Sequence, residues 1–215
     1  PHLAAQARAV FAKAAALLEA SNLTMSNVVK TVDYTTPSTL RDYKATGAIR
    51  KEMLGPVYPA AAGILLSRLL HPDALISLDV IATQDTPVAV NPGWGRYAKL
   101  TYAPAVQAAG MLFMSGQAAL DPATERAVHA GDVVAQADYT YGNVLQVLRA
   151  AGAGPEHLVK TIEYVTPAGL KRYREVAAVR ERLLTQPYPA STGCVCEALL
   201  RPEFEFEVDP LAILP

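Results

Sequence analysis

Apolar side chains recur at helical spacing across residues 132–151, and this pattern predicts an amphipathic helix. Asp132 is the expected N-cap of that helix, and Gly152 is its expected stop signal. The next apolar segment, residues 158–166, is rich in β-branched side chains and predicts a strand. A helix followed closely by a strand indicates that these elements pack as two layers.

The remaining segments extend this pattern in both directions. Pro167 suits the first turn of a second helix, which is expected to run to about Leu184. Closing strands are expected at residues 190–199 and 204–211. A hairpin that turns at residues 109–110 precedes the first helix. The order β-β-α-β-α-β-β predicts an α+β fold with two helices on one face of a sheet.

The chain also repeats itself. Residues 4–82 align with residues 134–212 without a gap, at a constant difference of 130. The identities include Val29-Lys30-Thr31 with Val159-Lys160-Thr161, and Tyr58-Pro59-Ala60 with Tyr188-Pro189-Ala190. Because the period is far longer than a solenoid unit, each copy is expected to be a small domain with its own core.

Three segments are therefore expected: a first domain at residues 1–82, a linker at 83–95 and a second domain at 96–215. The linker is rich in Pro, Gly and Asn, and its Trp94 is expected to pin it to a domain face. Residues 96–131 have no counterpart before the first copy. The first domain is therefore expected to lack its N-terminal hairpin in this chain.

Composition narrows the class of protein. Apolar residues make up 51% of the 215 and charged residues 18%, with a net charge of −1. No basic run is present, so neither nucleic acid nor a membrane surface is an expected partner. The apolar stretches are too short to span a bilayer. Two cysteines and four scattered histidines suggest neither a disulfide framework nor a metal site, and the expected location is the cytoplasm.

Residues 102–117, YAPAVQAAGMLFMSGQ, resemble the opening hairpin of the Rid family, the RidA/YjgF-like reactive-intermediate deaminases. The similarity continues through residues 132–136, 159–161 and 188–190. This resemblance implies a chorismate-mutase-like fold and a trimer of Rid domains with ligand clefts between neighbouring domains. It also implies hydrolysis of enamines and imines to ketoacids and ammonia, without a metal or organic cofactor.

Two family positions are altered in this chain. In the family, an arginine directly after Tyr-Pro-Ala holds the substrate carboxylate through a bidentate fork. The matching residues here are Ala61 in the first copy and Ser191 in the second. The family's closing-strand carboxylate corresponds to Ser77 in the first copy and to Glu207 in the second. The first copy thus keeps no charged group at these positions.

The second copy is the expected site. Glu207 is the candidate acid/base, and Tyr102, Ser191, Thr192 and Gly193 are the candidate binding residues. By the resemblance, the ligand is a small metabolite with an imine, enamine or carbonyl centre. Loss of the arginine implies an altered substrate scope and weak hydrolysis of 2-iminopropionate.

Other interpretations of the same residues stay open. Glu207 lies on an alternating strand, so its carboxylate could simply face solvent. Arg174 on the nearby helix is a candidate to replace the lost arginine. The chain could bind a metabolite without catalysis, or serve only to complete an oligomer, for which three chains are expected.

Overall fold

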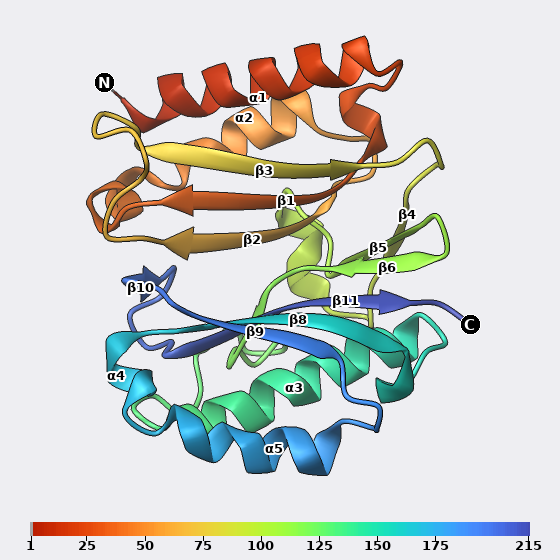
Figure 1. The fold of residues 1–215 in the computed structure, drawn as a ribbon. Coiled ribbons are helices and arrows are strands. Elements are labelled where there is room, and N and C mark those ends of the chain that lie inside the picture. Colours follow the sequence, from red (N-terminus) through yellow and green to blue (C-terminus); the bar gives the residue numbers. More distant parts are fainter. Residues whose placement is uncertain (1) are drawn as a thin grey trace.

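Two β-sheets face each other in the middle of the molecule, and helices cover their outer faces (Figure 1). The computed structural model describes residues 2–215. We refer to residues 2–82 as the N-terminal half, to 83–102 as the connector and to 103–215 as the C-terminal half. None of the helices in the described residues has the length and apolar character that crossing a membrane requires.

The N-terminal half is one mixed sheet under two helices. Its parallel pair, β1 with β2, and its antiparallel pair, β1 with β3, form the sheet order β10-β2-β1-β3. Strand β10 is contributed by the C-terminal half. The elements are α1 (Leu3–Ala20), β1 (Val28–Thr35), α2 (Ala45–Met53), β2 (Ala60–Leu65) and β3 (Ile76–Ala82). Phe11 and Val28 are buried between the helices and this sheet.

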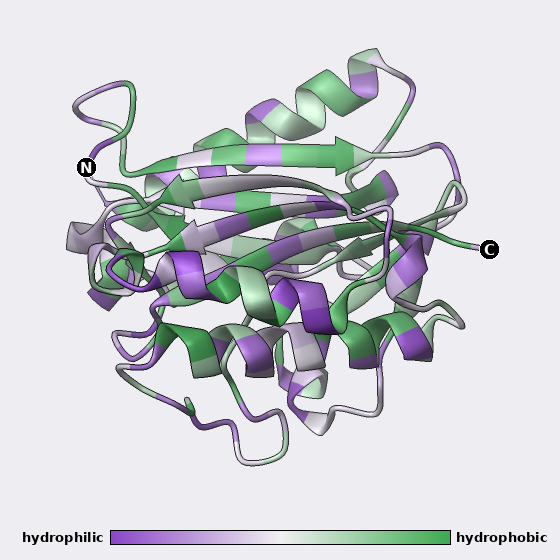
Figure 2. Cartoon of the chain, turned by 60° about the horizontal axis from the view of Figure 1, so that its bottom comes forward, coloured by the Kyte–Doolittle hydropathy of each residue, from purple (hydrophilic) through white to green (hydrophobic). Residues whose placement is uncertain are grey.

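The C-terminal half holds the larger sheet, in the order β4-β5-β6-β11-β8-β9, with β7 also paired to β11. Its strands are β4 (Val88–Val90), β5 (Ala105–Ala108), β6 (Met111–Met114), β7 (Gln117–Ala118), β8 (Leu158–Val165), β9 (Ala190–Val195), β10 (Ala198–Leu199) and β11 (Phe206–Ile213). Its helices are α3 (Val133–Ala150), α4 (Pro167–Leu170) and α5 (Val176–Leu183). Figure 2 brings their outer side forward, where hydrophilic and hydrophobic stretches alternate along the helices.

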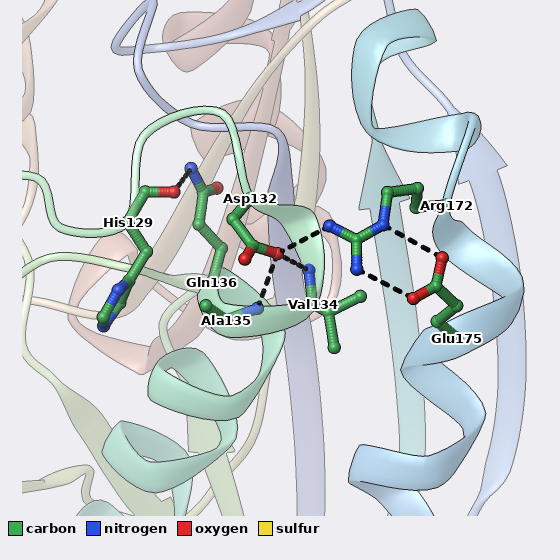
Figure 3. Close-up of polar contacts among 7 residues, drawn as sticks. All are labelled: His129, Asp132, Val134, Ala135, Gln136, Arg172 and Glu175. Atoms are coloured by element: carbon green, nitrogen blue, oxygen red, sulfur yellow. Dashed lines mark hydrogen bonds and ion pairs between the residues drawn. The ribbon is translucent and has the colours of Figure 1, made fainter.

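The predicted start of α3 is confirmed. The Asp132 carboxylate accepts hydrogen bonds from the amides of Val134 and Ala135, at 3.1 and 3.2 Å (Figure 3). It also accepts one from Arg172, whose fork holds Glu175 as well. These bonds satisfy amides that the first turn of a helix leaves unpaired, and they tie α3 to the segment before α5.

Two predicted elements differ from the structure, and the expected linker contains a strand. The helix expected after Pro167 is broken into α4, a 3-10 turn and α5, and Arg172, with φ −119° and ψ 9°, lies outside the helical region between α4 and the turn. The strand expected at 190–199 is split, since β10 leaves its own sheet to pair with β2. The expected linker contains β4, which pairs with β5 at the sheet edge.

Strand registers in the two halves differ by 130 residues. Thr31 lies opposite Ala61, and Thr161 lies opposite Ser191. Each half also carries the same irregularity near the start of its central strand, between β1 and β3 and between β8 and β11.

Both halves also bury an ion pair between sheet and helix. The Asp33 carboxylate lies 3.4 Å from Arg50 and accepts a hydrogen bond from the Tyr43 hydroxyl at 3.0 Å. The Glu163 carboxylate accepts hydrogen bonds from Arg180, at 2.9 Å, and from the hydroxyls of Tyr141 and Tyr173.

An apolar layer joins the facing sheets. It includes Val32 and Ile64 from the N-terminal half, and Tyr164 and Leu199 from the C-terminal half. Lys30 crosses this layer, where its ammonium pairs with Asp209 and donates to the Met114 carbonyl. A charge buried in this way costs free energy unless it is paired, so this contact fixes how the halves sit on each other.

Candidate active site

A cleft of about 310 Å³ lies between the two halves. Its floor comes from β2 of the N-terminal half and from β11 and the segment around β7 of the C-terminal half. The end of the connector forms a further wall. This volume is at the lower end of the ~300–1,000 Å³ range of small-molecule sites.

The Ser-Gly-Gln segment that follows β6 holds the two halves together at the cleft. The Ser115 hydroxyl accepts a hydrogen bond from the Ala61 amide at 2.8 Å and donates to the Ala103 carbonyl at 2.6 Å. The Gly116 amide donates to the Ala61 carbonyl at 3.0 Å. This segment therefore docks β2 against the C-terminal half and positions both walls of the site.

Gly116 also makes room for a carboxyl group. A Cβ at this position would lie 2.2 Å from Oε1 of Glu207 and 3.1 Å from the Ala62 side chain. Any larger residue would therefore force the Glu207 side chain to move. The glycine lets this carboxyl lie against β2 of the opposite half.

Glu207 is the acidic residue of the cleft lining, and it is 7% exposed. Burial and the nearby charge of Asp209 raise the pKa of its carboxyl to about 8, although the Lys30 ammonium opposes this shift. Within residues 2–215, no side chain or amide donates a hydrogen bond to this carboxyl. With a pKa of about 8, the carboxyl is largely protonated at neutral pH, and it is available to a ligand.

Aromatic side chains from the connector line the opposite wall. The rings of Trp94 and Tyr97 stack at 6.1 Å, and Tyr102 meets Tyr97 edge-on at 5.5 Å. Burial raises the pKa of Tyr97 to about 12 and also raises that of Tyr102. Both hydroxyls are therefore neutral near pH 7 and can donate hydrogen bonds to a ligand.

Cations also line the cleft. Arg50 is buried and held by Asp33 and by the Thr31 hydroxyl, at 3.4 and 3.0 Å. Arg201 donates to the Glu125 carbonyl at 2.9 Å. Arg96 lies over the Tyr97 ring, with 5.3 Å between its Cζ and the ring centroid.

The structure brings together only part of the predicted site. Glu207 and Tyr102 line the cleft, but their partners are Ala61 and its neighbours on β2 of the other half. Ser191, Thr192 and Gly193 lie on β9, exposed and outside this cleft. Within one chain β8 lies between β9 and β11 and keeps these strands roughly 10 Å apart, so the three β9 residues do not reach the cleft that Glu207 lines.

Two other candidates also lie elsewhere. Ser77, the first-copy counterpart of Glu207, is exposed on β3. Arg174 is exposed in the 3-10 turn before α5 and does not line the cleft.

The arginines of the cleft and Tyr97 are not among the residues predicted from the sequence. The connector residues belong to no repeated segment, so comparing the two copies draws no attention to them. The resemblance did carry one usable signal. It implied clefts between neighbouring domains. In this chain such a cleft has β2 of one half on one side and β11 of the other half on the other side.

Comparison with known proteins identifies the family of the chain. The family model described as endoribonuclease L-PSP matches residues 96–214. A RutC family protein from Synechocystis is 31% identical over 140 residues, which is 65% of this chain and 99% of that protein. A 2-iminobutanoate/2-iminopropanoate deaminase from Salmonella typhimurium is 32% identical over 136 residues, covering 62% of this chain and 95% of the deaminase.

Solved structures match over a similar share of the chain. A protein of unknown function from Pseudomonas aeruginosa aligns with a TM-score of 0.52 at 28% identity, over 61% of this chain and 94% of that one. A member of the conserved Rid protein family from Yersinia pestis aligns with a TM-score of 0.52 at 22% identity, over 60% of this chain and 99% of that one. The match over residues 96–214, the relatives and the α+β architecture together lead to one conclusion: this chain belongs to the Rid (RidA/YjgF) family.

Proposed function

We propose that the cleft hydrolyses the C=N bond of a small imine, or of the enamine that interconverts with it, with Glu207 as the acid/base. The observation that carries this proposal is a carboxyl buried in a small-molecule cleft, with its pKa raised to about 8. A general acid works best when its pKa lies near the working pH. The named activity of the Salmonella relative supports the same reaction class.

The chemistry follows from the protonation state of Glu207. Protonated Glu207 gives its proton to the imine nitrogen, which makes the carbon more electrophilic. The resulting carboxylate takes a proton from the attacking water, so a C–O bond forms and a carbinolamine results. The carboxyl then protonates the amine, the C–N bond breaks, and the carbinolamine hydroxyl gives its proton to the Glu207 carboxylate, which restores the starting state. The balance is one imine and one water giving one carbonyl compound and one ammonia.

The test is hydrolysis of imines made in situ from alanine, 2-aminobutyrate and phenylalanine by an L-amino acid oxidase. Semicarbazide traps the imine that remains, so an active protein lowers the rate of semicarbazone formation. We expect activity to fall as pH rises through about 8, because Glu207 then loses its proton. No acceleration over buffer with any of the three imines would contradict the proposal.

We further propose that the position of Ala61 alters the substrate scope. A side chain without charge stands where the family arginine is expected, so 2-iminopropionate loses a bidentate partner. If no other cation replaces it, losing such a contact removes about 2–5 kcal/mol when the partner charge is desolvated, which corresponds to about 1.5 to 3.5 decades in rate. A rate equal to that of an arginine-bearing relative would show that another cation of the cleft has taken over the role of the lost arginine.

We propose that the chain is a tandem duplication of a Rid domain, with the second copy starting at residue 96. The registers that differ by 130 residues, and the buried ion pair that recurs in each half, support this. The N-terminal half contains no counterpart of the β5–β6 hairpin within residues 2–82. On this interpretation the cleft corresponds to one between neighbouring Rid domains, here joined in one chain.

We also propose that chains associate through two sheet faces that have no partner within a single chain. Lys30 of one half pairs with Asp209 of the other, whereas their counterparts, Lys160 and Asp79, are both exposed. The halves are thus not related by a two-fold axis, since that axis would pair the counterparts too. A second copy can satisfy both faces, with Lys160 of the β8–β9 face meeting Asp79 on the β3 face of its neighbour.

Charge reversal tests this association. Lys160→Glu is expected to lower the mass measured by light scattering, because it places like charges opposite each other. Lys160→Glu combined with Asp79→Lys is expected to restore the mass by exchanging the two charges. The Rid resemblance predicts three chains in the assembly. A parent protein that stays monomeric at micromolar concentration would refute the proposed contact.

A further inference from the structure

The cleft carries a positive balance of charge. Lys44, Arg50, Arg96 and Arg201 line it, and Glu207 is the acidic residue of the lining. Because the pKa of Glu207 is about 8, its carboxyl is largely neutral at pH 7. Charges of one sign in a cleft with low-dielectric walls attract ligands of the opposite sign. The cleft is therefore suited to an anion.

Most of these cations already have partners or lie in solvent. Asp33 holds Arg50, the Glu125 carbonyl accepts a hydrogen bond from Arg201, and Lys44 is exposed at the rim. Arg96 differs from them. It is half-buried, and its Nε is enclosed without a hydrogen-bond partner. Among residues 2–215 its guanidinium makes no ion pair, so its charge is free to attract a ligand.

Arg96 is also positioned by its surroundings. It follows Trp94, which is buried in the core of the C-terminal half, and its guanidinium lies over the Tyr97 ring. Tyr97 is in turn held edge-on by Tyr102. A guanidinium stacked on an aromatic ring keeps its N–H groups free in the plane of the fork, so it can still bind a carboxylate through two hydrogen bonds.

We infer that Arg96 binds the anionic group of the substrate, from the connector wall, in place of the arginine absent at Ala61. This inference rests on the proposed function. It assigns the substrate class as imines that carry a carboxylate and an apolar or aromatic body. The body would pack among Trp94, Tyr97 and Phe204, which line the same cleft.

The test uses phenylpyruvate, the 2-oxo acid that hydrolysis of the phenylalanine imine would give. Isothermal titration calorimetry with the parent protein is expected to show binding. Arg96→Ala is expected to weaken binding at least tenfold, which corresponds to about 1.4 kcal/mol. Arg96→Lys is expected to recover part of the affinity, because it keeps the charge and loses the fork.

Two controls isolate the charge of Arg96. Arg174→Ala removes an exposed arginine outside the cleft and is expected to leave affinity unchanged. Phenylacetone replaces the carboxylate of phenylpyruvate with a methyl group. Its affinity is expected to be the same for the parent and for Arg96→Ala. Melting temperatures of all variants establish that each is folded.

Two outcomes would overturn the inference: no binding of phenylpyruvate by the parent, or equal affinity for the parent and Arg96→Ala. These outcomes differ from failure of the proposed function. Binding that depends on Arg96, with no imine hydrolysis, would leave the anion site standing and refute the catalytic role of Glu207. Hydrolysis that does not depend on Arg96 would leave the catalytic role of Glu207 standing and refute the anion site.

Discussion

Replacing Glu207 with glutamine is expected to slow imine hydrolysis by about 10²- to 10⁴-fold, the usual contribution of a positioned acid/base. Glutamine has nearly the same size and still forms hydrogen bonds, but it cannot exchange a proton. The cleft therefore keeps its shape while the proposed chemistry is removed. The measurement is kcat/KM for the phenylalanine imine in the semicarbazide assay.

Ser77→Ala is the matched control for this experiment, because Ser77 is the N-terminal counterpart of Glu207 and lies exposed on β3. It is expected to leave activity unchanged. Full activity in Glu207→Gln would show that this carboxyl moves no proton in the reaction.

The same variant tests the burial of Glu207 through stability. The carboxyl pKa rises from its usual 4.5 to about 8 on folding, so between these values the folded state binds more protons than the unfolded one. The stabilisation from this proton is complete below pH 4.5 and is lost as pH rises to 8, an effect of about 5 kcal/mol. Glu207→Gln is expected to lack this loss. Urea unfolding at pH 5 and pH 8.5 measures the change in the free energy of unfolding. The same change with pH in the parent and in Glu207→Gln would contradict this prediction.

Replacing Asp33 with alanine is expected to lower the free energy of unfolding by about 3–5 kcal/mol, because it leaves the Arg50 guanidinium buried without a counter-charge. Asp33 is 1% exposed, and the side chain of Arg50 is 6% exposed. The Tyr43 hydroxyl also loses its acceptor. Urea unfolding at pH 7 measures the change.

Asp33→Asn provides a milder variant that keeps the volume and an acceptor for Tyr43, so a loss of stability is measurable even if the alanine variant does not fold. Glu52→Ala is the control. It removes the exposed partner of Arg8 on the helix surface, and the urea midpoint is expected to stay the same. An Asp33→Ala protein as stable as this control would show that the buried pair contributes little.

The sequence by itself determined the local elements and their order. A period-3.6 pattern located α3 and a β-branched run located β8, because each buries one side of a regular element against its neighbours. Asp132 identified the start of α3, since capping needs only a side-chain oxygen next to free amides. The Rid resemblance was carried by several segments in order, and one of them includes Ser-Gly-Gln, whose bonds to Ala61 dock the two halves.

Tertiary structure decided which residues meet. Glu207 faces Ala61 and Ala62 of the other half, rather than Ser191 of its own, because the cleft forms where two sheets dock and not within one sheet. The packing of the connector places Arg96 and Tyr97 at the cleft, and no repeat or periodicity in the sequence predicts this packing. Spacing along a chain fixes the direction of a side chain within its own element. The residues that a side chain meets in the other half, and the pKa that these residues give it, depend on how the two halves pack.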